Sequence, residues 1–192
     1  MKLLKDAETW EVMEKPKDAN VVGSKWVFKA KKDTAEIVVW YRAHLMAQGF
    51  SQVLGVNYFD MFALVAHLAS IQTVLTFVAT EDYKTGQIDI KSAYLNGKLT
   101  SDEVIYMKQV LGYKVESAGK GVLVYQLKKS LYGLKQAGQH WYQKLVDIMT
   151  KLQFDRCKGD QAVFFYKRCE RTKVLIVVCT LITAQLWEKI EC

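Results

Sequence analysis

A single carboxylate, Asp89, stands in a pattern that would bring it to the surface of a sheet. Residues 87–91 read Gln-Ile-Asp-Ile-Lys, and this strict alternation of polar and apolar types is typical of a strand. In such a strand Ile88 and Ile90 point to one face, where they can pack on helices, and Asp89 points to the opposite, open face. A carboxylate on rigid backbone is the kind of ligand that hard cations such as Mg²⁺ bind. A lone aspartate in a strand is more often an ordinary surface residue, so the pattern by itself indicates only a candidate.

Basic residues could supply a second chemistry, the binding of polyanions. The chain has 192 residues with 27 Lys or Arg and 20 Asp or Glu, which gives a net charge of +7. This surplus favours polyanionic partners through counterion release, and it is equally compatible with a merely solubilising surface. Lys29, Lys31 and Lys32 fall in a turn-like stretch, where they form either a solvated tip or a contact to nucleic-acid backbone.

The elements that must position these residues alternate in type along the chain. Apolar spacing predicts helices over 68–80, with one broad buried face, and over 136–152. Runs of β-branched and aromatic residues predict strands over 26–28, 37–41, 87–91, 104–107, 122–127, 162–166 and 173–179. Helices between strands that carry acids on an open face predict an α+β fold, a two-layer sheet with helices on one face.

Cysteine spacing and hydrophobicity exclude other classes of protein. The four cysteines form no Cys-x-x-Cys pair and lie far from the three histidines, so zinc-finger spacing is absent. All four fall in residues 157–192, which predicts free thiols and no disulfide framework. The N-terminus lacks the apolar stretch of a signal peptide, and the most apolar segment, 174–182, has about half the length of a membrane-spanning helix. We therefore expect an intracellular protein with no membrane partner.

Four sequence segments, in order, resemble one protein family. SKWVFKAKKD (24–33) and YRAHLMAQGFSQ (41–52) resemble the fingers segments of copia-type retrotransposon reverse transcriptases. QIDIKSAYLNG (87–97) resembles the first palm motif of these enzymes, and KSLYGLKQAGQHWY (129–142) resembles the second. The similarity covers nearly the whole chain, from about residue 6 to residue 180. The sequence is identified as a fragment of a Pol polyprotein of this family.

The resemblance implies the fingers and a partial palm of a right-hand polymerase. Residues 1–86 would form a fingers-like segment with a connecting helix, and residues 87–180 the part of the palm that carries its first two motifs. Residues 181–192 would be an aberrant C-terminal tail that lacks the third palm motif. The implied partners are an RNA or DNA template-primer, deoxynucleoside triphosphates (dNTPs) and other Pol regions, and the implied location is the cytoplasm or a virus-like particle.

The resemblance also implies roles for individual residues. Nucleotide addition in this family uses two Mg²⁺ ions, which activate the primer hydroxyl and stabilise the leaving pyrophosphate. Asp89 would be the first-motif ligand of both metals, assisted by the backbone carbonyl of Ile90. Tyr94 would lie under the incoming sugar, and Arg42 would meet the triphosphate. The segment that packs against the nascent base pair and template would comprise Tyr132, Gly133, Leu134, Lys135 and Gln136.

The third palm motif of the family is an apolar strand followed by paired aspartates, and only the strand is present here. After residues 174–180 the chain continues with Leu181 and Ile182, and no aspartate occurs after Asp160. One carboxylate cannot hold two divalent cations. We therefore expect a reverse transcriptase domain that is catalytically inactive as encoded. We also expect an exposed strand edge, because half of the central hairpin would be missing.

Two alternatives stay open. The chain could be a non-catalytic basic remnant that binds nucleic acid through its fingers residues, or a pseudogene product without function. Leu54, Leu64 and Leu111 stand where the family commonly has proline, and the chain contains one proline, Pro16. Each of these changes is reachable by a single C-to-T transition, as expected of a silenced repeat.

Overall fold

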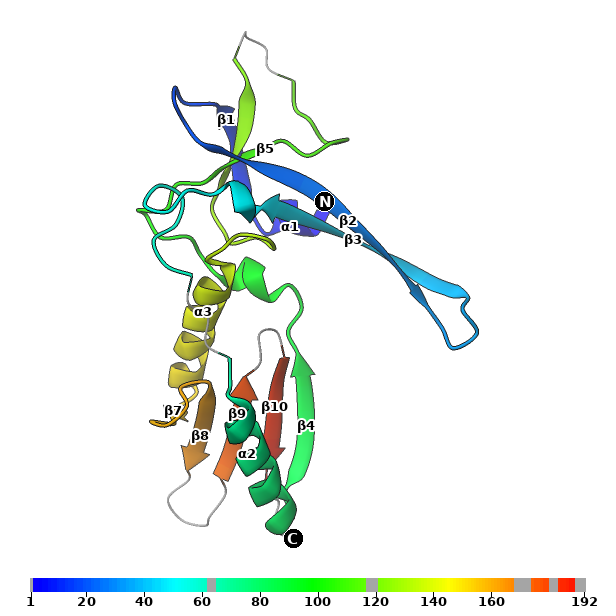
Figure 1. Ribbon diagram of the computed structural model, residues 1–192, viewed down its shortest axis with the longest axis vertical. Coiled ribbons are helices and arrows are strands. Elements are labelled where there is room, and N and C mark those ends of the chain that lie inside the picture. Colours follow the sequence, from blue (N-terminus) through cyan, green and yellow to red (C-terminus); the bar gives the residue numbers. More distant parts are fainter. Residues whose placement is uncertain (1, 62–64, 117–120, 168–173, 180–182, 189–192) are drawn as a thin grey trace. The chain divides into compact units, whose positions relative to one another are not determined.

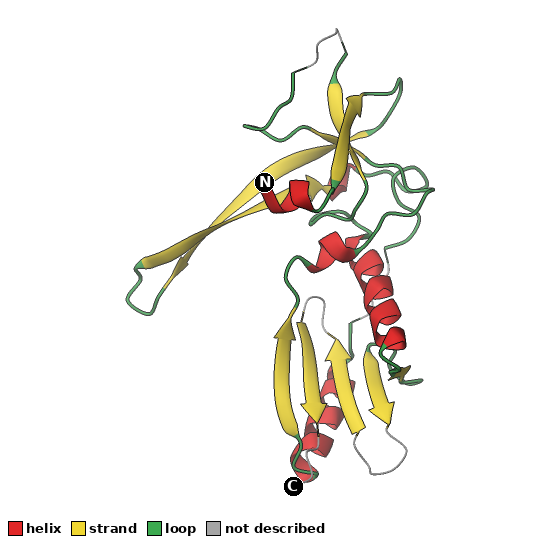
Figure 2. Ribbon diagram, turned by 180° about the vertical axis from the view of Figure 1, so that it is seen from behind, coloured by secondary structure: helices red, strands yellow, loops and turns green. Residues whose placement is uncertain are grey.

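The computed structural model describes the chain except residues 1, 62–64, 117–120, 168–173, 180–182 and 189–192. Leu64, Leu181 and Ile182, which enter the predictions above, therefore lie outside the described residues. The fold is α+β, with strands in two sheets and few helices, as the sequence predicts (Figures 1 and 2).

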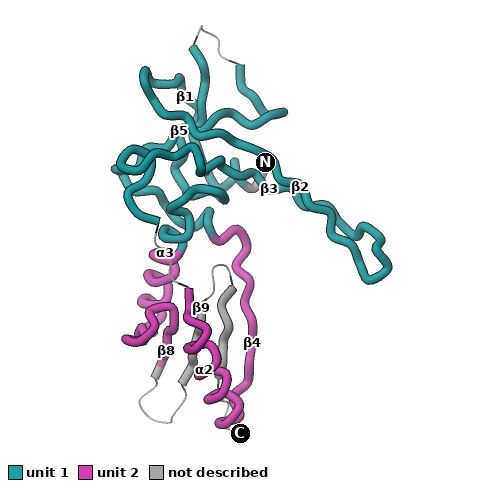
Figure 3. The backbone as a smooth tube through the Cα atoms, viewed as in Figure 1, with its two compact units in different colours: residues 1–61, 94–141 teal, residues 62–93, 142–192 magenta. Residues whose placement is uncertain are grey.

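The chain divides into two compact units that interleave along the sequence (Figure 3). The first unit comprises residues 1–61 and 94–141, and the second comprises residues 62–93 and 142–192. The prediction above divides the chain once, at residue 86. Each compact unit instead combines an early and a late part of the chain, because later strands pair with earlier ones.

The first unit is built on a sheet of strand order β1-β6-β5-β2-β3. Its strands are β1 (Trp10–Glu14), β2 (Val21–Lys32), β3 (Val38–Gln48), β5 (Tyr106–Lys108) and β6 (Leu123–Leu127). β2 and β5 are parallel and the other neighbours are antiparallel. Three short helices complete the elements of this part of the chain: α1 (Lys2–Asp6), η1 (Gly49–Ser51) and η2 (Ala93–Asn96), which begins one residue before the unit does.

β2 and β3 form a long antiparallel ribbon that extends out of the first unit (Figure 1). Trp26 pairs with Leu45 near its base and Ala30 pairs with Tyr41 toward its tip. The two predicted strands joined by a basic tip are therefore confirmed, although each strand is longer than predicted. The outer half of the ribbon is exposed: Phe28 stacks on Trp26 with ring centroids 6.2 Å apart and is still 75% exposed.

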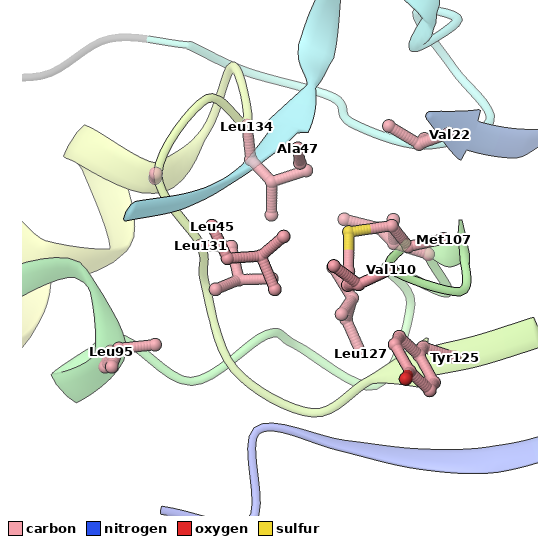
Figure 4. Packing of buried hydrophobic residues seen from close by; sticks show 12 residues of the cluster. Val22, Leu45, Ala47, Leu95, Met107, Val110, Tyr125, Leu127, Leu131 and Leu134 are labelled. Carbon is pink, nitrogen blue, oxygen red and sulfur yellow. The ribbon is translucent and has the colours of Figure 1, made fainter. Parts of the chain in front are cut away.

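The core of the first unit lies where the base of the ribbon meets β5 and β6 (Figure 4). Its buried residues include Val22, Leu45, Met107, Tyr125 and Leu131. Trp10 of β1 covers one side by stacking on Tyr125, with ring centroids 4.6 Å apart. Each buried side chain of this size stabilises the fold by about 1.5–3 kcal/mol relative to its exposed state.

The second unit carries a sheet of order β4-β10-β9-β8-β7. Its strands are β4 (Lys84–Asp89), β7 (Asp155–Arg156), β8 (Val163–Lys167), β9 (Val174–Cys179) and β10 (Thr183–Glu188). Helix α2 (Leu68–Thr80) lies along one face of this sheet in both views, and helix α3 (Ala137–Lys151) leads into the unit (Figures 1 and 2). Both helices match their predicted spans within a residue. Cys157 carries a free thiol.

Helix α2 of the second unit buries a narrower stripe of its surface than the sequence predicts. Val78 is buried on α2, and Ile71 and Val74 pack beside it, but Leu68 is 70% exposed. Among the described side chains the expected broad buried face is thus wrong, because the helix packs there on a small cluster around Ala162 and Val163. The burial predicted for Ile88 is also wrong, since that side chain is 48% exposed on β4.

Strand β10 overturns the expectation of an exposed edge. It lies between β4 and β9 and pairs antiparallel with both, from Thr183 opposite Asp89 to Glu188 opposite Lys84. The hairpin strand that was thought to be missing is therefore present, built from residues assigned above to an aberrant tail. Gly86 pairs with Leu186 inside this ladder.

Candidate substrate segment and the acidic strand

Asp89 is the last residue of β4 and its carboxylate is exposed. The strand covers 84–89 where the prediction gave 87–91, so Ile90 lies just beyond it as a half-buried residue. Both residues belong to the second unit, whereas the other predicted site residues belong to the first.

The strand beside Asp89 brings no second acid to this end of the sheet. The register partner of Asp89 is Thr183, and the one acid of β10, Glu188, pairs with Lys84 at the far end. Five residues of extended chain separate the two acidic positions by roughly 17 Å. No group of three or more His, Cys, Asp or Glu side chains that could hold a metal ion occurs in the described part of the chain. The donors described here therefore do not fit a pair of Mg²⁺ ions.

In the first unit, three aromatic rings link segments that are far apart in sequence. The Tyr94 ring on η2 meets the Tyr132 ring edge-on, with centroids 4.7 Å apart. The His44 ring of β3 approaches Tyr132 from another side, at 5.6 Å. Burial raises the pKa of Tyr94, and the nearby Tyr132 raises it further. The structure thus brings two of the predicted substrate-binding residues into direct contact.

Arg42 lies on the exposed half of β3, opposite Lys29 of β2. Its guanidinium carbon stands 5.4 Å from the centre of the Trp40 ring, and the Lys31 ammonium stands 5.7 Å from the same ring. Such cation–π contacts orient the cations without neutralising them. Desolvation, with the Arg42 charge as a lesser cause, lowers the pKa of His44, so this imidazole adds no full charge at neutral pH.

Gly133 lies directly against the end of β3. Its φ is +91°, and a β-carbon there would collide with the carbonyl oxygen of Ala47. Two backbone hydrogen bonds fasten the contact, from Ala47 N to the Tyr132 carbonyl at 2.8 Å and from Gly49 N to the Gly133 carbonyl at 3.1 Å. Main-chain atoms therefore hold the second motif segment against the end of β3.

Lys135 extends its side chain over Tyr58. Its ammonium donates to the Tyr58 hydroxyl at 2.9 Å and stands 4.5 Å from the centre of that ring. The group is only half-buried, so it keeps donors for an anionic partner.

Gln136 is fully buried, and its amide is used inside the protein. The amide nitrogen donates to the Asn57 carbonyl at 2.8 Å, and the amide oxygen accepts from Gln52 Nε2 at 3.0 Å. Gln52 also accepts the backbone N–H of Lys135 at 2.8 Å. In this conformation Gln136 offers its amide to Gln52 and Asn57, and sequence reasoning missed both of these partners.

A second buried group that sequence reasoning missed surrounds His140. Its Nε2 lies 2.8 Å from a Glu103 carboxylate oxygen, and its Nδ1 lies 2.8 Å from the Ser130 hydroxyl. The order Ser–His–Glu resembles a hydrolytic triad, but Ser130 is 0% exposed and no substrate carbonyl reaches it. The group instead ties the start of α3 to the loop before β5.

Comparison with known proteins identifies the family of the chain. The family described as "Reverse transcriptase (RNA-dependent DNA polymerase)" matches residues 7–184. The chain belongs to the reverse transcriptase family. The resemblance to copia-type enzymes inferred from the four segments is thereby supported by a match that covers them all.

Relatives of this reverse transcriptase segment are Pol polyproteins of plant transposons. It is 37% identical over 178 residues to the "Retrovirus-related Pol polyprotein from transposon TNT 1-94" of Nicotiana tabacum, covering 93% of this chain and 13% of the relative. It is 31% identical over 170 residues to the polyprotein from transposon RE1 of Arabidopsis thaliana, covering 88% of this chain and 11% of the relative. The chain thus spans about a tenth of the length of these relatives.

The helices offer no membrane-spanning segment. Within the described ranges, none is both long enough and apolar enough to cross a bilayer.

Proposed function

We propose that this reverse transcriptase segment contacts template-primer and dNTP but does not add nucleotides. In this assignment the β2–β3 ribbon corresponds to the fingers, and the β4-β10-β9-β8 sheet corresponds to the partial palm. The family match and the position of the first palm motif at the end of β4 support it.

One observation carries the inactive half of the proposal. The family reaction uses two divalent cations, which need several carboxylate oxygens within a few ångströms. The register places Thr183, and no acid, beside Asp89. Asp89 would remain a metal-ligand position by descent, with Ile90 beside it, and the Mg²⁺ pair would lack its second set of ligands.

The binding half rests on the contacts of the first unit. Tyr94 and Tyr132 form one aromatic surface, and Arg42 and Lys135 are the cations suited to phosphate oxygens. Gly133 lets this segment approach β3, and Gln136 acts indirectly by holding the backbone of the segment in place.

The ribbon by itself favours a second candidate function, that of a non-catalytic module that binds nucleic acid. Lys25, Lys29 and Lys31 alternate along β2 and therefore share one face. Arg42 pairs with Lys29 and lies on that same face. A basic face of this kind binds nucleic-acid backbone without reading sequence.

Both halves are tested in one sample of the purified 192-residue chain. A primed RNA template with dNTPs and Mg²⁺ or Mn²⁺ measures extension, and retention of the same duplex measures binding between about 50 and 200 mM salt. We expect salt-dependent retention without extension. We also expect Arg42→Gln to reduce the salt slope by about one, while Arg156→Gln, at another exposed arginine, on β7, leaves it unchanged. Templated incorporation by the unaltered chain would overturn the inactive assignment, and absence of retention at low salt would overturn the binding assignment.

A further inference from the structure

A hollow of about 480 Å³ opens on the first unit at a place that the proposed function does not use. It lies where β1 and β5 end and where β2 and β6 begin, and it shares no residue with the segment 132–136. Its lining consists of Lys15, Val21, Lys108, Gln109, Lys114, Val122, Leu123 and Val124.

The lining combines two kinds of surface. Three valines and a leucine supply an apolar wall, and three exposed lysines supply positive charge around it. No acid lines the hollow, and in the described part of the chain none of the three ammonium groups forms an ion pair. Glu14 is not part of the lining, and its carboxylate lies against Gly121, the residue before Val122. Charge and shape are therefore complementary to an anion that carries an apolar body.

The wall that carries Lys114 is anchored at both sides. The buried Tyr125 donates its hydroxyl to the Tyr113 carbonyl at 3.1 Å. Gln109 accepts the Val115 N–H at 2.6 Å and donates to the Val115 carbonyl at 3.1 Å. These bonds fix the backbone on either side of Lys114 before any ligand arrives, which lowers the entropic cost of binding.

The remaining two lysines are fixed by the sheet. Lys108 belongs to β5, where it pairs with Val124 of the apolar wall. Lys15 donates its backbone N–H to the Val122 carbonyl at 2.8 Å, just beyond the end of β1. Three lysines on three separate, anchored backbone segments thus line one hollow together with the apolar residues.

We propose that this hollow binds a phosphorylated nucleoside, with the phosphates between the lysines and the base against the valine wall. Its volume lies within the range of roughly 300–1,000 Å³ that small-molecule sites have. A free nucleotide and the terminal nucleotide of a strand offer the same chemistry, and the experiment separates these two sources. The proposal does not depend on the substrate role of Arg42 or Lys135.

The test uses the whole chain, deoxyadenosine triphosphate, inorganic pyrophosphate and a short single-stranded oligonucleotide with or without a 5′-phosphate. The double variant Lys108→Ala/Lys114→Ala should weaken triphosphate binding at least roughly tenfold, since charge-assisted hydrogen bonds to phosphate are among the strong ones. The matched control Lys5→Ala/Lys151→Ala removes the same charge from exposed sites and should change binding little. Val122→Asn, at a side chain 69% exposed, should weaken the nucleotide but not pyrophosphate.

Location is read by crosslinking an 8-azidoadenine nucleotide and mapping the modified peptide. Modification of residues 121–124 supports the proposal, and modification confined to residues 132–136 overturns it. A pocket variant that binds like the control double variant overturns it as well. Preference for the free nucleotide or for the phosphorylated oligonucleotide identifies the source, and either preference supports the site. Because Arg42→Gln acts on duplex retention and not on this hollow, failure of one proposal leaves the other measurable.

Discussion

Gly133 shows how one residue type makes the contact between two distant segments possible. A left-handed φ of +91° and the carbonyl oxygen of Ala47 at the place of a β-carbon are separate demands, and glycine meets both. The family motif predicts a glycine at this position. The reason for it, a strand end 86 residues earlier in the chain, is visible only in the structure.

Replacing Gly133 by alanine should destabilise the first unit by roughly 2 kcal/mol or more, because left-handed strain and a backbone collision add. Hydrogen exchange at the Ala47 and Gly49 amides, which bond to the 132–133 segment, measures the effect. Gly55→Ala is the matched control, since Gly55 has φ +79° with nothing within 4 Å, and it should cost about 1 kcal/mol. Equal costs at the two glycines would refute the role of the close approach.

Some residues of the candidate site can be placed from the local sequence pattern, and others cannot. Local alternation predicts that Asp89 lies in a strand, and it does, although the strand covers 84–89 and ends at Asp89 where the prediction gave 87–91. The buried amide of Gln136 could not be predicted, because its partners Gln52 and Asn57 come from a loop about 80 residues away. Burial of a polar side chain depends on such distant partners, and local pattern carries no record of them.

At the scale of elements, the sequence predicts helices from their periodicity better than it predicts which strands pair. Helices α2 and α3 match prediction because the 3.6-residue period is a local property. Strand β10 was missed because its identity lies in its register with β4 and β9, which no local pattern records. The same reasoning explains the narrow buried stripe of α2, since the partner surface decides how many of its apolar residues are covered.

The start of α2 depends on one buried acid, Asp160. Its carboxylate accepts the His67 N–H at 2.8 Å and the Ala162 N–H at 3.0 Å, and a His67 ring nitrogen lies 3.2 Å away. Burial, the largest single influence, raises the pKa of Asp160. Hydrogen bonds from Ser70, His67 and Ala162, together with the His67 charge, outweigh burial and lower the pKa below its ordinary value. This acid therefore connects α2 to the strand β8 that follows it.

A depressed pKa fixes the direction of the pH dependence. The stabilisation by Asp160 is fully present above the ordinary carboxyl pKa of about 4, and it is lost as the pH falls through the lower value of the folded protein. Asp160→Asn should destabilise the second unit by about 1–3 kcal/mol near neutral pH and remove this acid-dependent part. Urea unfolding at neutral and acidic pH measures it. The exposed Asp155→Asn variant is the control, and equal losses for both would contradict the capping role.

At the scale of the molecule, each compact unit is built from two separate parts of the chain, which sequence reasoning did not predict. A boundary along the chain was expected, but residues 94–141 return to the N-terminal strands. The net charge follows from the sequence because it is a sum over residues. The family could be predicted because its motifs occur in order along the chain. The assignment of segments to compact units was not, because it depends on long-range strand pairing.

The isolated chain also exposes large apolar side chains. Phe50, Leu111 and Leu68 are 80%, 79% and 70% exposed. Surfaces of this kind promote association when they are uncovered. We expect the purified chain to self-associate with rising concentration, as measured by sedimentation velocity, despite its net charge of +7. The Phe50→Ser/Leu111→Ser double variant should shift the distribution toward monomer, and a wild-type chain that stays monomeric throughout would contradict the prediction.

The ladder between β4 and β10 has a consequence for descent. Its six residue pairs are joined through amides and carbonyls, which every residue type other than proline supplies in the same way. A mutation that erased an acid near this hairpin would leave those bonds, and hence the sheet, unchanged. A segment of this fold that lost its chemistry would therefore keep a recognisable architecture, since selection for chemistry and persistence of shape act on different atoms.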